Sequence, residues 1–157
     1  MTEARWLDDR EQRAWRSFLR MHAELDARLG RELPAGLTLA EFGVLVALSD
    51  VPAGRLRAYE LGAALQWEKS RVSHQVRRME QRGLVAREEC PSDGRGAFVV
   101  LTAAGRRALE EAAPAHVGTV RRLFFEVLSA EQVDALAEIS AAVLRRLADD
   151  PDRGGTC

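Results

Sequence analysis

Residues 69–85 read KSRVSHQVRRMEQRGLV, and this stretch decides the fold of the chain. The apolar residues Val72, Val76 and Met79 recur every third or fourth position, which predicts a helix with one face packed on a core. The rest of the surface of this helix is rich in cations and hydroxyls. They are Lys69, Ser70, Arg71, Ser73, His74, Arg77 and Arg78.

Two residues mark the ends of this predicted helix. Ser70 is expected at or near its N-terminus, and Gly83 stands where a left-handed residue would end it. Arginine can donate in a fork to guanine, and hydroxyls and helix-end amides hold phosphates, so the polar face suits a DNA major groove. The helix alone is equally compatible with a solvated amphipathic surface, so the choice between the two interpretations depends on the neighbouring sequence.

The composition is that of a folded, mainly helical protein. Of the 157 residues, 30% are charged and 46% are hydrophobic, which is enough for a real core. The formal net charge is −1, so any attraction to nucleic acid must be local. From residue 68 to residue 107 there are nine cations and five anions, so the middle of the chain is basic.

Several features of the sequence favour a cytoplasmic protein. The two cysteines, Cys90 and Cys157, do not form a disulfide framework, and no secretory segment is expected at the start of the chain. No apolar run approaches the roughly 20 residues that span a bilayer.

A short helix is predicted immediately before the central one, at residues 59–65. Residues 66–68 are the only spacer between the two, which is the arrangement of a helix-turn-helix. The small side chains of Ala63 and Ala64 are expected to let the second helix cross closely.

Two strand-like runs, at residues 84–88 and 97–101, follow the central helix. The loop between them contains the sequence CPSDGRG at residues 90–96, which predicts a hairpin. A helix-turn-helix followed at once by a hairpin is a winged helix. Arg95, between two glycines at the tip, suits a narrow minor groove, and Asp93 is expected to orient an arginine by a charge-assisted hydrogen bond. An ordinary solvated arginine is the alternative.

Helices with apolar stripes are expected at both ends of the chain. One is predicted from Asp8 to Leu29, with Gly30 as its stop, and two more from 103 to about 128 and from 130 to about 147. Capping-box spacings mark the starts of the first and last of these helices, at Asp8 and Ser129, and of a further helix between them, at Thr38. These stripes have no large partner within one subunit, and a two-fold dimer is the simplest closed arrangement that buries them.

Several motifs together resemble the MarR family of winged-helix transcription regulators. They are Tyr59-Glu60-Leu61, the stretch 69–85, Asp93-x-Arg95 and the run VVLTAAG at 99–105. The resemblance implies a mainly α fold with a small β-hairpin wing. It also implies a single domain over 1–157, with a winged helix-turn-helix at about 38–107 and dimerisation helices at about 8–36 and 108–148.

The resemblance also implies a function. It predicts a homodimer that binds a pseudo-palindromic operator, acting as a repressor that a small, often phenolic, ligand releases. Ser70, Arg71, Ser73, His74 and Arg77 would face the major groove together with the adjacent Lys69. Arg78 would support the wing or a phosphate, and Arg95 would enter the minor groove. His74 stands where an arginine is frequent, so base preference does not transfer there.

Trp15, His22 and His116 are candidate ligand-binding residues, because they lie on stripes that the family uses for effectors and combine aromatic walls with imidazoles. Ordinary dimer-core residues are the alternative. The histidines and cysteines show no metal-ligand spacing, so no metal or cofactor is expected. A zinc site from His22 and His116, redox control through Cys90 and a winged helix used only for protein contact remain as alternatives. No nucleophile–base set is present, so an enzyme is not expected.

Overall fold

The computed structural model describes residues 5–34, 36–89 and 96–150. The chain divides into two compact units, Met1–Thr119 and Val120–Cys157, and each is described by itself. Within the described ranges no helix is both long and apolar enough to cross a membrane.

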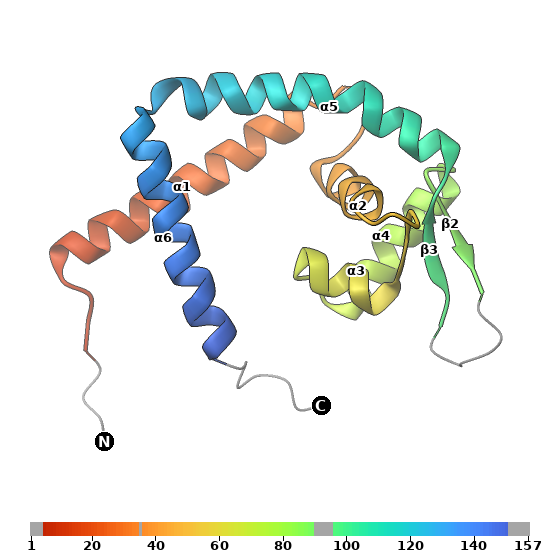
Figure 1. Ribbon diagram of the computed structural model, residues 1–157, viewed down its shortest axis with the longest axis horizontal. Coiled ribbons are helices and arrows are strands. Elements are labelled where there is room, and N and C mark those ends of the chain that lie inside the picture. The colour runs from red at the N-terminus through yellow and green to blue at the C-terminus, as the bar shows by residue number, and fades with distance from the viewer. Residues whose placement is uncertain (1–4, 35, 90–95, 151–157) are drawn as a thin grey trace. The chain divides into compact units, whose positions relative to one another are not determined.

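Helices dominate both units, as Figure 1 shows. The first unit contains α1 (Asp9–Glu32), α2 (Leu39–Ser49), β1 (Arg55–Arg57), α3 (Ala58–Leu65), α4 (Lys69–Gln81), β2 (Val85–Glu88), β3 (Phe98–Leu101) and most of α5 (Ala103–Leu123). The second contains the end of α5, a 3-10 turn at Phe125–Val127 and α6 (Ala130–Asp149). The predicted fold class, mainly α with a small β element, is confirmed.

Three helices begin with a complete capping box. In α1, α2 and α6 the side chains of Asp8, Thr38 and Ser129 accept a hydrogen bond from the amide three residues later, and the acidic or amide side chain there accepts one in return. Each such cap contributes about 0.5–2 kcal/mol. These starts are where the sequence predicted them.

The core of the first unit is built around α2. Val44, Leu45 and Leu48 of this helix are fully buried, together with Leu61 of α3 and Met79 of α4. Burial of each such side chain contributes about 1.5–3 kcal/mol. Helices α3 and α4 are therefore fixed to one shared apolar centre.

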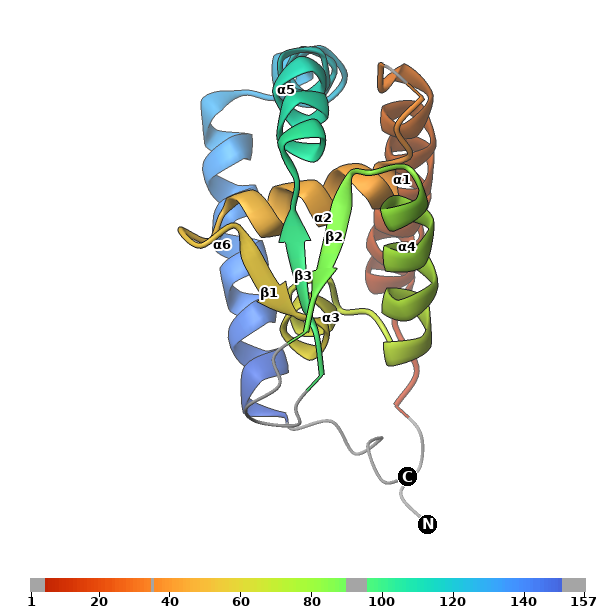
Figure 2. The ribbon, with the colours of Figure 1, turned by 90° about the vertical axis from the view of Figure 1, so that its right-hand side faces the viewer.

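The sheet has the strand order β1-β3-β2, with β3 in the middle (Figure 2). Both pairings are antiparallel, with Val85 opposite Leu101 in one and Arg55 opposite Val100 in the other. The predicted hairpin of β2 and β3 is confirmed, and β1 adds a third strand to its outer edge.

Two predicted helix ends are wrong. Helix α1 continues through Gly30 to Glu32, because a helical glycine costs only about 1 kcal/mol and the Cβ position at Gly30 lies 3.9 Å from Leu39 Cβ, in ordinary packing contact. Helix α5 ends at Leu123 rather than near Leu128. The 3-10 turn replaces its last residues and leads directly into the capping box of α6.

Gly62, rather than Ala63 or Ala64, permits the close approach of α3 and α4. A Cβ at Gly62 would lie 3.0 Å from the carbonyl oxygen of Trp67 and 3.3 Å from Cγ2 of Val72. Ala63 and Ala64 are exposed. The expectation that these two alanines enable the crossing is therefore wrong.

Candidate nucleic-acid interface

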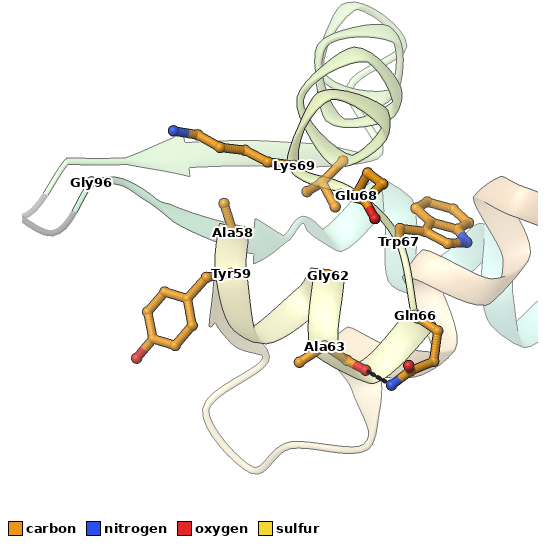
Figure 3. Close-up of a pocket in the computed structure, with 10 residues that line it drawn as sticks. Ala58, Tyr59, Gly62, Ala63, Gln66, Trp67, Glu68, Lys69 and Gly96 are labelled. Carbon is orange, nitrogen blue, oxygen red and sulfur yellow. Dashed lines mark hydrogen bonds between the residues drawn. The ribbon is translucent and has the colours of Figure 1, made fainter. Parts of the chain in front are cut away.

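The turn between α3 and α4 has a defined backbone. Gln66 adopts the left-handed conformation with φ of 55°, and the amide of Trp67 donates to the carbonyl of Gly62 at 2.9 Å. The side chain of Gln66 donates to the carbonyl of Ala63 at 2.8 Å (Figure 3). These bonds fix the direction in which α4 leaves the turn.

Helix α4 has the two faces that the sequence predicted. Val72, Val76 and Met79 are buried in the core. The predicted DNA-contacting residues on this helix are all exposed. They are Lys69, Ser70, Arg71, Ser73, His74, Arg77 and Arg78.

The cations of α4 and its surroundings fall into two groups. Arg82, Arg87 and Arg55 are used inside the fold, in ion pairs with Glu41, Glu80 and Glu88 at 2.6, 3.5 and 3.0 Å. Lys69, Arg77 and Arg78 have no ion-pair partner among the residues that the structure describes. The surface of α4 therefore carries cations that no carboxylate in the described ranges neutralises, so they are available to bind an external anion.

The N-terminus of α4 lies next to Ser70, as the sequence predicted. Glu68 is the N-cap, its side chain makes no capping hydrogen bond, and Ser70 is the second residue of the helix. The first turn also contains no acidic residue. Because no side chain caps this end and no acidic residue lies in the first turn, the positive partial charge of the helix N-terminus is not neutralised. This charge and the first backbone amides favour the binding of a phosphate there.

Arg71 has a partner that the sequence interpretation missed. Its guanidinium carbon lies 4.2 Å from the centre of the Trp67 ring, a cation–π contact between the turn and the first turn of α4. The signal in the sequence was the spacing of four residues between an aromatic side chain and an arginine.

The C-terminal end of α4 is held by a buried carboxylate. Arg82, the residue after α4, donates from Nη1 to Oε2 of Glu41 at 2.6 Å and to the carbonyl of Gly36 at 3.4 Å. Burial raises the pKa of Glu41, but hydrogen bonds from Arg82 and Thr38 and the charge of Arg82 outweigh it and hold this pKa below its ordinary value.

The base of the wing is built on Phe98. The guanidinium carbons of Arg55 and Arg57 lie 4.5 and 4.4 Å from the centre of its ring. Arg57 also donates to the carbonyl of Gly96 at 3.2 Å. Neither arginine was singled out from the sequence. The predicted wing residues Asp93 and Arg95, and the thiol of Cys90, lie outside the described residues.

An open groove of about 770 Å³ lies beside the turn (Figure 3). Tyr59 and Lys69 are exposed on its lining, and Gly96 lies at the base of the wing. The groove therefore joins the start of α4 to the wing.

The three candidate ligand residues fall into two places. Trp15 and His22 belong to an exposed aromatic row on α1, in which Phe18 stacks on both at ring distances of 5.8 and 6.3 Å. His116 of α5 instead lies against Phe42, 4.5 Å between ring centres. Its Nδ1 is buried and has no hydrogen-bond partner in the described part of the chain, and burial lowers the pKa of His116. Among the residues described, no group of three potential metal ligands was found.

Comparisons with known proteins agree on one family. The MarR family model matches residues 35–96. The transcriptional regulator HosA of Escherichia coli O111:H- is 33% identical over 128 residues, which cover 81% of this chain and 91% of HosA. The chain belongs to the MarR family of transcription regulators. As a MarR-family regulator it is not an enzyme, as the sequence predicted.

Two solved structures are also similar to this chain. Sco3205 from Streptomyces coelicolor, a MarR-family regulator solved in complex with DNA, is 42% identical with a TM-score of 0.87, covering 94% of this chain and 93% of Sco3205. BpsR from Bordetella bronchiseptica, described for the regulation of its DNA binding by 6-hydroxynicotinic acid, is 26% identical with a TM-score of 0.70, covering 86% and 92%. This MarR-family chain thus shares its fold with proteins that bind DNA.

Proposed function

We propose that this protein is a cytoplasmic repressor that binds a specific, pseudo-palindromic DNA sequence as a homodimer. The observation that carries the proposal is the surface of α4, where every predicted contact residue is exposed and Lys69, Arg77 and Arg78 have no ion-pair partner in the described part of the chain. A helix anchored by its apolar face and open on its polar face is suited to enter a major groove.

The residues of α4 divide by their expected contacts. Ser70, Ser73, His74 and Arg77 recur at i, i+3, i+4 and i+7, so they share one face that would meet base edges. Lys69 and Arg78 would neutralise phosphates beside that face. Arg95 would reach the minor groove from the wing. This arrangement combines contacts that position the helix with contacts that read sequence.

Exposed apolar side chains support the homodimer. On α1, Trp15 and Phe18 are 53% and 49% exposed in the single chain. On α6, the exposed apolar residues include Ile139, Val143 and Leu144. Large exposed apolar patches mark association surfaces, and a two-fold pairing of identical subunits covers such patches on both partners at once.

A small aromatic acid is the effector that fits the candidate ligand residues. The unpartnered Nδ1 of His116 would gain a hydrogen bond from or to such a compound, beside the aromatic wall of Phe42. The exposed row of Trp15, Phe18 and His22 on α1 is a separate place where such a compound could stack. The relative BpsR, whose DNA binding 6-hydroxynicotinic acid regulates, supports this class of ligand.

Selection of bound sequences from random double-stranded DNA tests the proposal. The full-length protein should enrich an inverted repeat whose half-sites lie about 10 bp apart, because two-fold symmetry places one α4 on each half-site. Weak binding that falls with salt and enriches no sequence would contradict it, and would favour a winged helix used for protein contact.

A further inference from the structure

Trp67 and Arg71 form a unit at the leading end of α4. Trp67 belongs to the turn, where its amide is bonded to Gly62 and its side chain packs partly against the core. The ring of Trp67 and the side chain of Lys69 extend to opposite sides of the turn (Figure 3). The guanidinium carbon of Arg71 lies 4.2 Å from the centre of this ring.

The contact with Trp67 uses none of the hydrogen-bond donors of Arg71. The guanidinium carbon lies over the face of the Trp67 ring, and the guanidinium carries five N–H groups in its own plane. Arg71 makes no hydrogen bond or ion pair with any residue that the structure describes. Arg82 and Arg55, by contrast, donate hydrogen bonds to Glu41 and Glu88. The contact with Trp67 thus orders the side chain of Arg71 and leaves its N–H groups available as hydrogen-bond donors.

The position of Arg71 on the helix indicates what it contacts. It follows Ser70 by one residue and is therefore turned by about 100° from it around the helix axis. It stands seven residues before Arg78, so these two arginines share one flank of α4. Side chains on a helix lean toward its N-terminus, which agrees with the reach of Arg71 back to Trp67. Arg71 therefore lies beside the row formed by Ser70, Ser73, His74 and Arg77.

We propose that Arg71 binds a backbone phosphate of DNA and that Trp67 is the positioning residue that holds its guanidinium ready to do so. The inference rests on the proposed function, and it revises the expectation from the family resemblance that Arg71 faces the major groove. If the side chain of Arg71 is already ordered before DNA binds, less conformational entropy is lost on binding. This difference corresponds to a several-fold gain in affinity. Trp67 thereby acts on DNA only through Arg71.

A double-mutant cycle on the full-length dimer tests this coupling. The probe is the duplex that the wild-type protein selects from random DNA. The variants are Trp67→Leu, which keeps apolar bulk at the turn, Arg71→Ala and the double variant. Arg71→Ala should weaken binding about tenfold and lower the slope of log affinity against log salt by about 2, because the dimer loses one phosphate contact in each subunit. Trp67→Leu should weaken binding about three- to tenfold with the slope unchanged.

The double variant gives the decisive comparison. In the Arg71→Ala background, Trp67→Leu should not weaken DNA binding further. In an Arg77→Ala background, Trp67→Leu should still weaken DNA binding about three- to tenfold, because the contact of the Trp67 ring is with Arg71 and not with Arg77. Trp67→Phe, which keeps an aromatic face, should restore part of the affinity. Thermal unfolding of each variant separates these effects from loss of fold.

Three results would overturn the inference. Equal costs of Trp67→Leu with and without Arg71 would show that Trp67 acts through the fold. An unchanged salt slope in Arg71→Ala, with relaxed preference at one base pair, would make Arg71 a base contact. Wild-type affinity in Arg71→Ala would remove it from the interface. A wild-type protein that selects no sequence would instead contradict the proposed function itself.

Discussion

The Nη1 atom of Arg82 lies 2.6 Å from Oε2 of Glu41, whose side chain is 2% exposed, although the two residues are 41 positions apart in the chain. The same carboxylate accepts the amide of Thr38 at 2.9 Å and so closes the capping box of α2. One buried oxygen thereby links the start of α2 to the end of α4. Helix α4 is therefore held at its C-terminal end by a charge-assisted hydrogen bond to a buried carboxylate.

Arg82→Ala should lower the free energy of unfolding by about 1.5–3 kcal/mol, because it leaves the buried carboxylate of Glu41 short of a charged donor. Urea denaturation at fixed protein concentration measures the loss. Arg87→Ala is the matched control. Its partner Glu80 is exposed, at 3.5 Å, so at most about 1 kcal/mol should be lost. Equal losses in the two variants would contradict the structural role of the Glu41 contact.

Glu41 should also make stability depend on pH in the acid range. Its pKa in the fold is below the ordinary value of 4.5, so the unfolded chain binds this proton more readily. Its contribution is therefore complete above about pH 4.5 and is lost as pH falls through the lower pKa of the folded state.

Glu41→Gln should flatten the fall in unfolding free energy below that pH, as measured by urea denaturation at a series of acid pH values. Adding Arg82→Ala to Glu41→Gln should not change the pH slope further. A slope in Glu41→Gln equal to that of the wild type would show that other carboxylates account for the acid sensitivity.

The face of α4 that carries Arg77 should discriminate between DNA sequences. Arg77→Ala should reduce the preference for the selected duplex over a scrambled one by about 1–3 kcal/mol, if Arg77 donates both of its outer nitrogens to guanine. Fluorescence anisotropy with both duplexes measures the difference. Arg16→Ala on α1 removes the same charge and should leave the preference unchanged. Equal losses on both duplexes would make Arg77 a phosphate contact.

Small aromatic acids should both stabilise the protein and release it from DNA. At a concentration 100 times its dissociation constant, a ligand adds about 2.7 kcal/mol to the free energy of unfolding, which a thermal shift detects. A panel of benzoic, hydroxybenzoic and hydroxypyridine carboxylic acids is the suitable probe. His116→Leu should abolish the response while leaving DNA affinity without ligand intact. A panel that changes neither melting temperature nor DNA affinity would exclude this class of effector.

Much of the fold could be predicted because its signals are local. The capping boxes at Asp8, Thr38 and Ser129 lie within four residues of sequence and were all found in the structure. The apolar spacing of Val72, Val76 and Met79 identified the buried face of α4, and its exposed face followed by exclusion. Gly83, with φ of 72°, has the left-handed backbone expected of a residue that ends a helix.

Contacts between distant residues could not be predicted in the same way. The local sequence places Glu41 in a capping box but does not show that it is buried, or that Arg82, 41 residues later, supplies its charged partner. The crossing at Gly62 depends on where Trp67 and Val72 lie in space. The contact between Trp67 and Arg71 is local, but whether an arginine four residues after a tryptophan reaches its ring depends on the geometry of the turn.

If two copies of α4, held in one dimer, read one operator, the affinity for DNA depends on the distance between the two half-sites. The affinity of the full-length protein is measured for the selected inverted repeat and for the same half-sites separated by five more base pairs. The insertion turns one half-site by about half a helical turn. The affinity for this duplex should therefore fall to near that for a single half-site. Equal affinity for both duplexes would contradict it.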